Sequence, residues 1–161
     1  MSAAASFRVR DFASADIDSL LDLFRDSVRN VARKDYSEEQ VLAWAPDDLD
    51  RPAWASKCAS RQTFVAELDD TLAGFGDLEP DGHLDMMFVH SRFQRRGIAS
   101  MLLEKIESSA RRRHIARLYT EASITAKPFF EHRGFQMIAP QVVRKRGQEF
   151  INYRMEKILD H

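Results

Sequence analysis

The sequence contains little cysteine, proline or glycine and no long run of apolar residues. Its single cysteine, Cys58, cannot form an internal disulfide, which is typical of the reducing cytoplasm. Six glycines and five prolines among 161 residues exclude collagen-like and low-complexity chains. No segment approaches the roughly 18 apolar residues of a membrane span, and the N-terminal segment lacks the apolar core of a signal peptide. We therefore expect a cytoplasmic protein with no membrane partner.

The length and composition indicate one globular domain that covers residues 1–161. Hydrophobic residues make up 44% of the chain and charged residues 30%, which are ordinary values for a folded domain. The net charge of −1 combines a balance of −9 over residues 1–90 with +8 over residues 91–161. Either the C-terminal half faces an anionic partner, or the two halves attract each other in the fold. A pI of about 6.5 counts against a dedicated nucleic-acid-binding protein.

Apolar periodicity predicts an α+β domain with a mainly antiparallel sheet. Residues 83–89 are too continuously apolar for simple alternation, which indicates a central strand buried on both faces or a strand with a bulge. Asp16 and Ser37 are expected to cap the first two helices. The expected order is a strand at 7–10, helices at 16–28, 37–44 and 52–60, strands at 63–68, 71–78 and 83–89, a helix at 98–113, a strand at 116–121, a helix at 126–133, and strands at 136–144 and 149–157.

An arginine-rich loop, residues 92–96, joins a predicted buried strand to the clearest predicted helix. Gly97 opens that helix, and the small residues Ala99 and Ser100 follow. A helix N-terminus leaves backbone N–H groups without partners and carries about half a positive charge. The segment therefore predicts a phosphate or pyrophosphate cradle. The glycine spacing matches neither a P-loop nor a dinucleotide-binding fingerprint.

Two motifs in this order resemble the GNAT acetyltransferase superfamily. Gln94-x-x-Gly97-x-Ala99 is similar to the family's motif A, and residues 126–135 (Ala-Lys-Pro-Phe-Phe-Glu-His-Arg-Gly-Phe) are similar to its second signature. The order of predicted elements matches along essentially the whole chain. The resemblance implies the GNAT fold, with a central mixed, mainly antiparallel sheet of six to seven strands flanked by helices. Two splayed strands of that sheet would form the acyl-CoA groove.

The resemblance also implies which residues bind acetyl-CoA, the expected co-substrate; no metal is expected. The strand before motif A would pair with the pantetheine arm, the motif A amides would hold the pyrophosphate, and the second signature would lie beside the thioester. The implied residues are Met87, Phe88, Val89, Arg95, Arg96, Gly97, Ile98, Ala99, Ser100, Ser123, Ala126, Phe129 and Phe130. Phe130 stands where most members carry a tyrosine that protonates the leaving thiolate.

Transfer to an amine requires a base, because a free alkyl amine has a pKa of about 10 and must lose a proton before it attacks. The resemblance implies a base on the strand before motif A, and Asp85 is nearest to that position. Further carboxylates at Asp77, Glu79 and Glu121 are alternatives. A backbone N–H near Phe88 is expected to polarise the thioester carbonyl.

With Phe130 in place of the usual tyrosine, Tyr153 is the first candidate for the catalytic acid, and packing across the sheet is the alternative. A thiolate with a pKa of about 8.5 can also leave without much protonation. The sequence therefore leaves open whether the reaction uses an acid at all.

The predicted function is transfer of an acetyl group from acetyl-CoA to a primary amine of a small molecule or a protein. The alternative is a catalytically weak acyl-CoA-binding module, suggested by Phe130, and nucleic-acid binding is a third hypothesis. An acidic N-terminal half would suit a cationic amine acceptor, and a basic C-terminal half would suit the phosphates of CoA. A homodimer is possible from the family resemblance.

Several other residues admit a functional and a structural interpretation. Trp44 and Trp54 flank an acidic loop and either line an acceptor pocket or pack in the core. Cys58 lies in a stretch of alanine and serine with no neighbouring histidine, so we expect a buried thiol rather than a nucleophile. The histidines show no metal-ligand spacing. They are His83, His90, His114 and His132.

Overall fold

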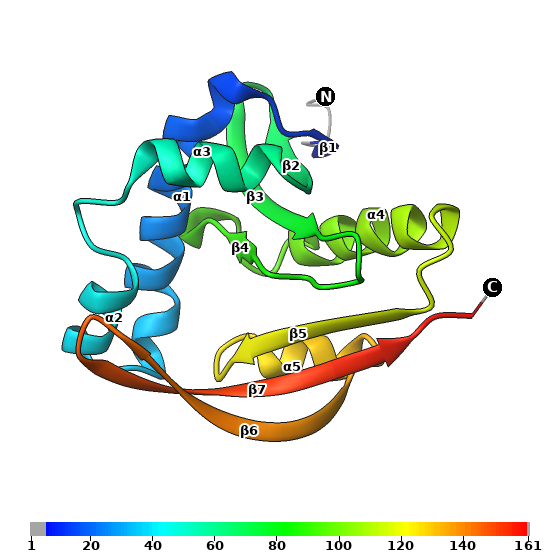
Figure 1. Ribbon diagram of the computed structural model, residues 1–161. Coiled ribbons are helices and arrows are strands. Elements are labelled where there is room, and N and C mark those ends of the chain that lie inside the picture. Colours follow the sequence, from blue (N-terminus) through cyan, green and yellow to red (C-terminus); the bar gives the residue numbers. More distant parts are fainter. Residues whose placement is uncertain (1–5, 161) are drawn as a thin grey trace.

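A computed structural model describes residues 6–160 (Figure 1). Its strands and helices follow the predicted order closely. The strands are β1 (Arg8–Asp11), β2 (Gln62–Leu68), β3 (Thr71–Leu78), β4 (Met87–Val89), β5 (Arg117–Ser123), β6 (Gln136–Lys145) and β7 (Gln148–Ile158). The α-helices are α1 (Ile17–Asn30), α2 (Glu38–Trp44), α3 (Arg51–Ala59), α4 (Ile98–Arg112) and α5 (Lys127–His132). Short 3-10 helices cover Ser14–Asp16, Ala32–Lys34 and Ser91–Phe93.

The strands form two antiparallel sheets that meet along one line. The first has the order β1-β2-β3-β4, and the second has the order β5-β7-β6. A single parallel bridge, His83 with Tyr119, joins them. In Figure 1, β5 runs below β4 and the second sheet curves away from the first. The predicted α+β class and GNAT-type arrangement with splayed strands are therefore confirmed.

The joint between the sheets depends on Gly82. The backbone N–H of Tyr119 donates to the Gly82 carbonyl at 3.1 Å, and the Leu84 N–H donates to the Tyr119 carbonyl at 2.8 Å. A Cβ atom on Gly82 would lie 2.0 Å from the Arg117 carbonyl oxygen, and the residue has φ of +96°. Glycine alone tolerates both conditions. The sheets are thus held together at the start of β5 and separate toward the ends of β4 and β5.

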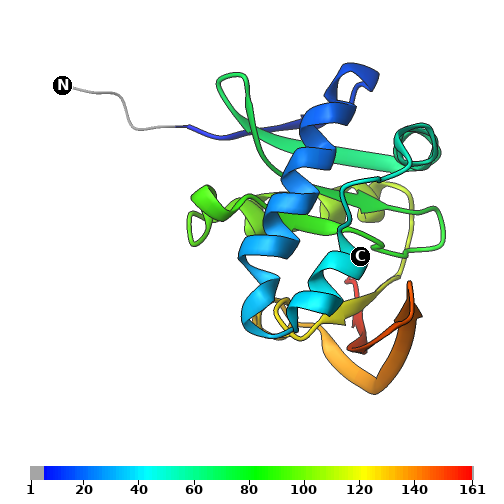
Figure 2. The same cartoon turned by 90° about the vertical axis from the view of Figure 1, so that its left-hand side faces the viewer.

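Each face of the first sheet buries its own hydrophobic core. Phe64 and Ala66 face α4, while Val65 between them faces α1, as alternation along a strand requires. Figure 2 shows α1 crossing in front of the sheet and α4 behind it. The core on the α4 side continues under the second sheet to Phe130 and Met155. This shared core fixes how the two sheets splay.

The predicted strand at 83–89 is shorter in the structure, because only residues 87–89 form β4. Before β4 the chain bulges, and the N–H groups of Asp85 and Met86 both donate to Oδ1 of Asp77, at 2.8 and 2.9 Å. Asp77 is fully buried. A side chain therefore replaces the backbone acceptors that a regular strand would have used. This interruption turns the Asp85 side chain out of the strand alternation.

The two predicted helix caps differ in outcome. Ser37 accepts from the Gln40 N–H at 3.1 Å and forms a capping box, as predicted. Asp16 precedes α1 as expected, but its carboxylate makes no cap to that helix and instead pairs with Arg10 and the Ala13 N–H. A 3-10 turn ahead of α1 explains this, since it directs the carboxylate back toward β1. Within residues 6–160 no helix is long and apolar enough to span a membrane.

Candidate functional site

A cavity of about 310 Å³ opens where β4 and β5 separate, and we call it the α4 cavity. Its walls are the open edge of β4, the loop and first turn of α4, and the segment from the end of β5 into α5. Twelve of the thirteen residues implied for acetyl-CoA binding line it. They are Met87, Phe88, Val89, Arg95, Gly97, Ile98, Ala99, Ser100, Ser123, Ala126, Phe129 and Phe130.

The start of α4 presents unpaired backbone donors to this cavity. Gly97 adopts φ of +80° at the N-cap, and a Cβ atom built on it would meet nothing within 4 Å. The first helical hydrogen bond of α4 runs from Met101 N–H to the Gly97 carbonyl. The N–H groups of Ile98, Ala99 and Ser100 therefore have no helical acceptor. An anion with several oxygens fits such a helix start, which also carries the positive end of the helix dipole.

Arginines without a carboxylate partner surround the helix start. No ion pair within 4.0 Å involves Arg92, Arg95, Arg96 or Arg133 among residues 6–160. Arg133 instead contacts Ser100 Oγ. The guanidinium of Arg96 lies 4.9 Å from the Phe7 ring centroid, so Arg96 packs outside the cavity, unlike its neighbours in the motif. The unpaired positive charge adds to the attraction for phosphate groups.

The open edge of β4 offers donors at alternate residues. The Asp77 N–H donates to the Met86 carbonyl, and the His90 N–H donates to the Ala73 carbonyl. In an antiparallel pair every second residue bonds to the neighbouring strand, so residues 86, 88 and 90 are the ones that bond to β3. The N–H groups of Met87 and Val89 consequently point away from β3, toward the gap. The donor expected near Phe88 is therefore Met87 or Val89, because the Phe88 N–H itself is turned toward β3.

A larger cavity of about 620 Å³ lies on the other side of the gap, and we call it the hairpin cavity. It extends from the bulge before β4 to the inner face of the β6–β7 hairpin. It shares Trp44, Met87, Phe88, Ser123, Ala126 and Phe130 with the α4 cavity. The two cavities therefore meet where β4 and β5 diverge, and groups bound in each could touch there.

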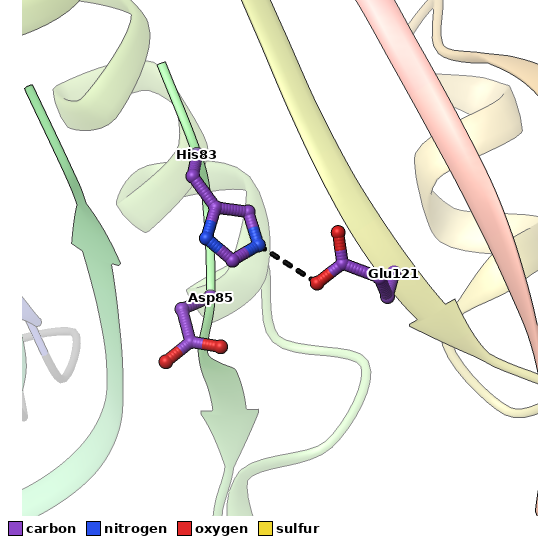
Figure 3. Close-up of side chains that lie close together, drawn as sticks. All are labelled: His83, Asp85 and Glu121. Atoms are coloured by element: carbon purple, nitrogen blue, oxygen red, sulfur yellow. Dashed lines mark hydrogen bonds and ion pairs between the residues drawn. The ribbon is translucent and has the colours of Figure 1, made fainter. Parts of the chain in front are cut away.

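Two carboxylates line the hairpin cavity, Asp85 and Glu121. Figure 3 shows Glu121 pointing from β5 toward His83, with Asp85 on the other side of the segment that carries His83. His83 Nε2 lies 2.7 Å from Glu121 Oε1, and its Nδ1 bonds to Glu79. Burial lowers the pKa of His83, but the bonds to Glu121 and Glu79 outweigh this and raise it to about 9. The imidazole is therefore charged at neutral pH.

Asp85 is held by two cations. Lys57 Nζ lies 3.2 Å from its Oδ2 and an Arg61 nitrogen lies 2.9 Å from the same oxygen. Burial alone would favour the neutral carboxyl, but Lys57, His83 and Arg61 hold the pKa of Asp85 below its usual range. His83, Asp85 and Glu121 offer ligand atoms within 4.8 Å of one another. Because these atoms already pair with one another and with Lys57 and Arg61, the cluster is an ion-pair network as it stands.

The other candidate residues lie outside the cavities or are enclosed. Asp77 is engaged in the bulge, and burial raises its pKa to about 6. Glu79 bonds to His83 and lies 3.3 Å from Arg61. Tyr153 is placed on the opposite face of β7 from its neighbours Asn152 and Arg154, which line the hairpin cavity. Lys127 Nζ lies 5.2 Å from the Tyr153 ring centroid, so this ring packs toward α5. Alternation along β7 thus turns the predicted acid away from the hairpin cavity.

The structure shows where the two tryptophans and the cysteine lie. Trp44 lines both cavities and Trp54 lines the hairpin cavity, while both also pack against core aromatics such as Phe24 and Phe88. Cys58 is 1% exposed, and burial raises its pKa to about 11. A buried, neutral thiol does not act as a nucleophile, so the expected structural role of Cys58 is confirmed.

The structure distinguishes between the two explanations for the charge asymmetry. Among residues 6–160, His83 with Glu121 is the single ion pair within 4.0 Å that joins the acidic half to the basic half. No lysine or arginine after residue 90 pairs with a carboxylate before it. Attraction between the halves is thus not expressed in ion pairs. The excess positive charge instead gathers at the helix start and on the β6–β7 hairpin.

Sequence reasoning missed His83 as part of the site, because its partners come from other strands. Glu79 and His83 flank a turn, but Glu121 is 38 residues further along and reaches His83 only through the parallel bridge to β5. The hairpin residues Lys145 and Arg154 were missed for the same reason. Nothing in the local pattern of a hairpin indicates which face will close a cavity.

We predict that replacing His83 with Gln changes how stability depends on pH. The folded pKa of about 9 exceeds the unfolded value of about 6.5. The stabilisation is therefore complete below pH 6.5 and is lost as the pH rises through 9. Thermal melts at pH 6 should show the variant roughly 2–6 °C below the wild type. The difference should vanish by about pH 10.

The matched control is His132→Gln, because His132 is exposed and has no ion pair in the described chain. Its melting temperature should track the wild type at every pH. A His83→Gln difference that persists unchanged at high pH would mean that the imidazole contributes by packing alone.

Comparisons with known proteins all point to the same family. The profile described as an acetyltransferase (GNAT) domain matches residues 32–157. A protein of Escherichia coli K12, described as the uncharacterised N-acetyltransferase YafP, is 36% identical over 150 residues, which are 93% of this chain and 95% of that protein.

Solved structures agree with this family assignment. A GCN5-related N-acetyltransferase from Rhodopseudomonas palustris superposes with a TM-score of 0.91 at 30% identity, covering 99% of this chain and all of that one. The PaiA N-acetyltransferase of Thermoplasma acidophilum, solved with coenzyme A, gives a TM-score of 0.80 at 18% identity, covering 96% of this chain and 99% of that one. At that identity the second likeness concerns the fold alone.

Proposed function

The chain belongs to the GNAT acetyltransferase family, and on that premise we propose that it transfers the acetyl group of acetyl-CoA directly to a primary amine of a small molecule or a protein. One observation carries this proposal. Two cavities meet where β4 and β5 diverge: the first is lined by free N–H groups and Arg95, and the second carries, beside four cationic side chains, the carboxylates of Asp85 and Glu121. A thioester and an amine brought to that meeting point would be in contact.

The α4 cavity fits acetyl-CoA as a substrate. The free N–H groups of Ile98, Ala99 and Ser100 suit the pyrophosphate, and the open edge of β4 at Met87 and Val89 suits the amide-containing pantetheine arm. Met87 also faces the hairpin cavity, so its N–H is placed to donate to the thioester carbonyl oxygen as negative charge develops there.

Glu121 is the carboxylate that we propose as the general base. Asp85 is neutralised by two cations, whereas Glu121 has His83 as its one partner in the network. An ammonium with a pKa of about 10 would lose its proton to Asp85 against a gap of more than about six pKa units. The pKa of His83 is about 9, so where His83 has lost its proton the Glu121–His83 pair can take one from the amine against a much smaller pKa gap than Asp85 could. Glu79, on the other nitrogen of His83, gives the proton a route to solvent.

None of the three tyrosines, all of which lie within residues 6–160, lines the α4 cavity. Tyr36 donates its hydroxyl to the Ile151 carbonyl at 2.8 Å, Tyr119 bonds to Asp81, and Tyr153 faces α5. Phe130 is buried and carries no hydroxyl. A thiolate of pKa about 8.5 leaves readily without a proton donor. The proposed reaction therefore releases the thiolate of CoA as such, with its proton taken from solvent.

Calorimetric titration tests the cofactor groove. Ala99 lines the α4 cavity in the first turn of α4. A carboxylate at this position would meet the pyrophosphate and occupy the unpaired N–H groups, so we expect Ala99→Glu to weaken acetyl-CoA binding by about 10- to 100-fold. Ser108→Glu places the same charge on an exposed turn of the same helix and should leave binding unchanged.

Equal binding by wild type and Ala99→Glu would contradict the assignment of the groove. Release of CoA that requires an added amine separates the enzyme from a catalytically weak acyl-CoA-binding module. Slow release at one rate with and without amines would favour the module.

A further inference from the structure

The far wall of the hairpin cavity is positively charged. The β6–β7 hairpin contributes Lys145, Arg146 and Arg154 to it. None of the three has a carboxylate within 4.0 Å among the described residues. Arg146 donates to the Ala43 carbonyl at 2.7 Å, which fixes its position beside α2. Unpaired cations that line a cavity are placed to meet an anion from outside the protein.

Among these cations, Lys145 gives the strongest indication of a site for an anion. Its Nζ lies 6.0 Å from the Trp44 ring centroid, at the edge of the cavity. Lys145 as a residue is exposed, but desolvation of its ammonium at the cavity wall and the neighbouring charge of Lys57 hold the pKa of Lys145 below its usual range, although Asp85 opposes this. Lys57 itself is already paired with Asp85. An additional negative charge between the two lysines would relieve their repulsion.

The carboxylates of the cavity do not favour a second cation on the substrate. Asp85 is neutralised by Lys57 and Arg61, and Glu121 by His83. A polyamine would place its additional charges against the cations of the hairpin, and like charges so placed cost binding energy. We therefore do not expect an acceptor with several positive charges, which the acidic N-terminal half alone would suit.

Beside these charged groups, the rest of the cavity wall is largely aromatic. Its rings belong to Phe24, Tyr36, Trp44, Trp54, Phe88 and Phe150. An apolar or aromatic body suits such a wall. Asn152 lies on the same wall near Ser123, and its Oδ1 is buried without a hydrogen-bond partner. An acceptor at that point suits the N–H of an incoming amine.

Resting on the proposed function, we propose that the acceptor is an amine with an apolar body and an anionic group, a carboxylate or a phosphate. The amine points to Glu121 and Asn152, and the anion lies against Lys145. An aromatic α-amino acid is the simplest molecule with these features. In the reaction the amine nitrogen forms the new bond to the acetyl carbon, the carbon–sulfur bond breaks, and the anionic group is unchanged.

Matched acceptors test the inference. L-phenylalanine and L-phenylalaninamide share one body and one amine and differ in the carboxylate, and the corresponding aminophosphonate tests a phosphate-like anion. With acetyl-CoA saturating, the initial rate of CoA release should give a kcat/KM at least about tenfold higher for the anionic acceptors than for the amide. In Lys145→Glu that preference should fall to about one or invert.

The matched control is Arg144→Glu, because Arg144 is the neighbouring residue on β6, is exposed and pairs with Glu149 outside the cavity. It should keep the wild-type preference. Weaker acetyl-CoA binding by Lys145→Glu would place Lys145 with CoA and overturn the inference, as would equal rates for phenylalanine and its amide.

A binding measurement separates this inference from the proposed function. Ligand-detected NMR of L-phenylalanine and its amide, without acetyl-CoA, reports on the cavity alone. Preferred binding of the carboxylate that is lost in Lys145→Glu supports the inference even where no acetylation occurs. In that case the proposed function is wrong, while the inference about the acceptor stands. Binding of the anionic probe no tighter than that of the amide, or no binding, overturns the inference whatever the turnover.

Discussion

Replacement of Glu121 with Gln is expected to lower kcat for acetyl transfer by about 100- to 10,000-fold, the range in which a positioned general base contributes. Gln keeps the length and the hydrogen bond to His83 but cannot take a proton from the amine. Glu121 lines the hairpin cavity and lies outside the α4 cavity. Acetyl-CoA binding by calorimetry should therefore stay at the wild-type value while turnover falls.

Two further variants sharpen this experiment. Asp85→Asn should cost about tenfold or less, because its carboxylate is already neutralised by Lys57 and Arg61. Glu156→Gln makes the same chemical change on β7, where Glu156 pairs with Arg117 outside both cavities, and should leave kcat unchanged. A larger loss in Asp85→Asn than in Glu121→Gln would transfer the role of base to Asp85.

The pH profile of the wild type gives an independent check of the base. If the Glu121–His83 pair receives the proton, the rate should rise with pH up to about 9, where His83 loses its charge. His83→Gln should change the shape of that rise. An unchanged profile would remove His83 from the proton route and leave Glu121 acting alone.

Replacement of Asp77 with Ala is expected to lower the free energy of unfolding by about 3–5 kcal/mol, because two N–H groups lose their acceptor at about 1–3 kcal/mol each and Arg61 loses one of its three carboxylate partners. Asp77 is fully buried and lies 3.3 Å from Arg61. Its Oδ1 also accepts from the N–H groups of Asp85 and Met86, which the variant would leave without an acceptor. Urea unfolding at pH 7 measures the loss.

Asp77→Asn serves as the paired variant because its amide oxygen can still accept both N–H groups. It should cost clearly less than Asp77→Ala. The folded pKa of about 6 lies above the unfolded value of about 3.9, so protonation favours the folded state. The stabilisation is complete below the unfolded pKa and is lost as the pH rises through 6. Between pH 7 and pH 5 the wild type should therefore gain stability relative to Asp77→Asn, and equal losses in the two variants would contradict this role for the bulge.

Local sequence determined the elements and the anion-binding half of the site. Apolar periodicity, the Ser37 cap and the glycine before α4 each act over a few residues, so the helix ends and the helix start at Gly97 could be placed without the fold. Turn residues placed the β6–β7 hairpin in the same way, across Arg146 and Gly147, both at positive φ. These features follow from bonding between near neighbours in the chain.

Tertiary structure alone decided the chemistry of the hairpin cavity. Alternation along β7 requires Tyr153 and Arg154 to face opposite ways, but only packing against α5 determines that Tyr153 turns away and Arg154 turns inward. His83 meets Glu121 only through the bridge between the sheets. The physical reason is that the period of a strand defines two faces, whereas the neighbours on each face come from distant segments whose register is set by the folded core.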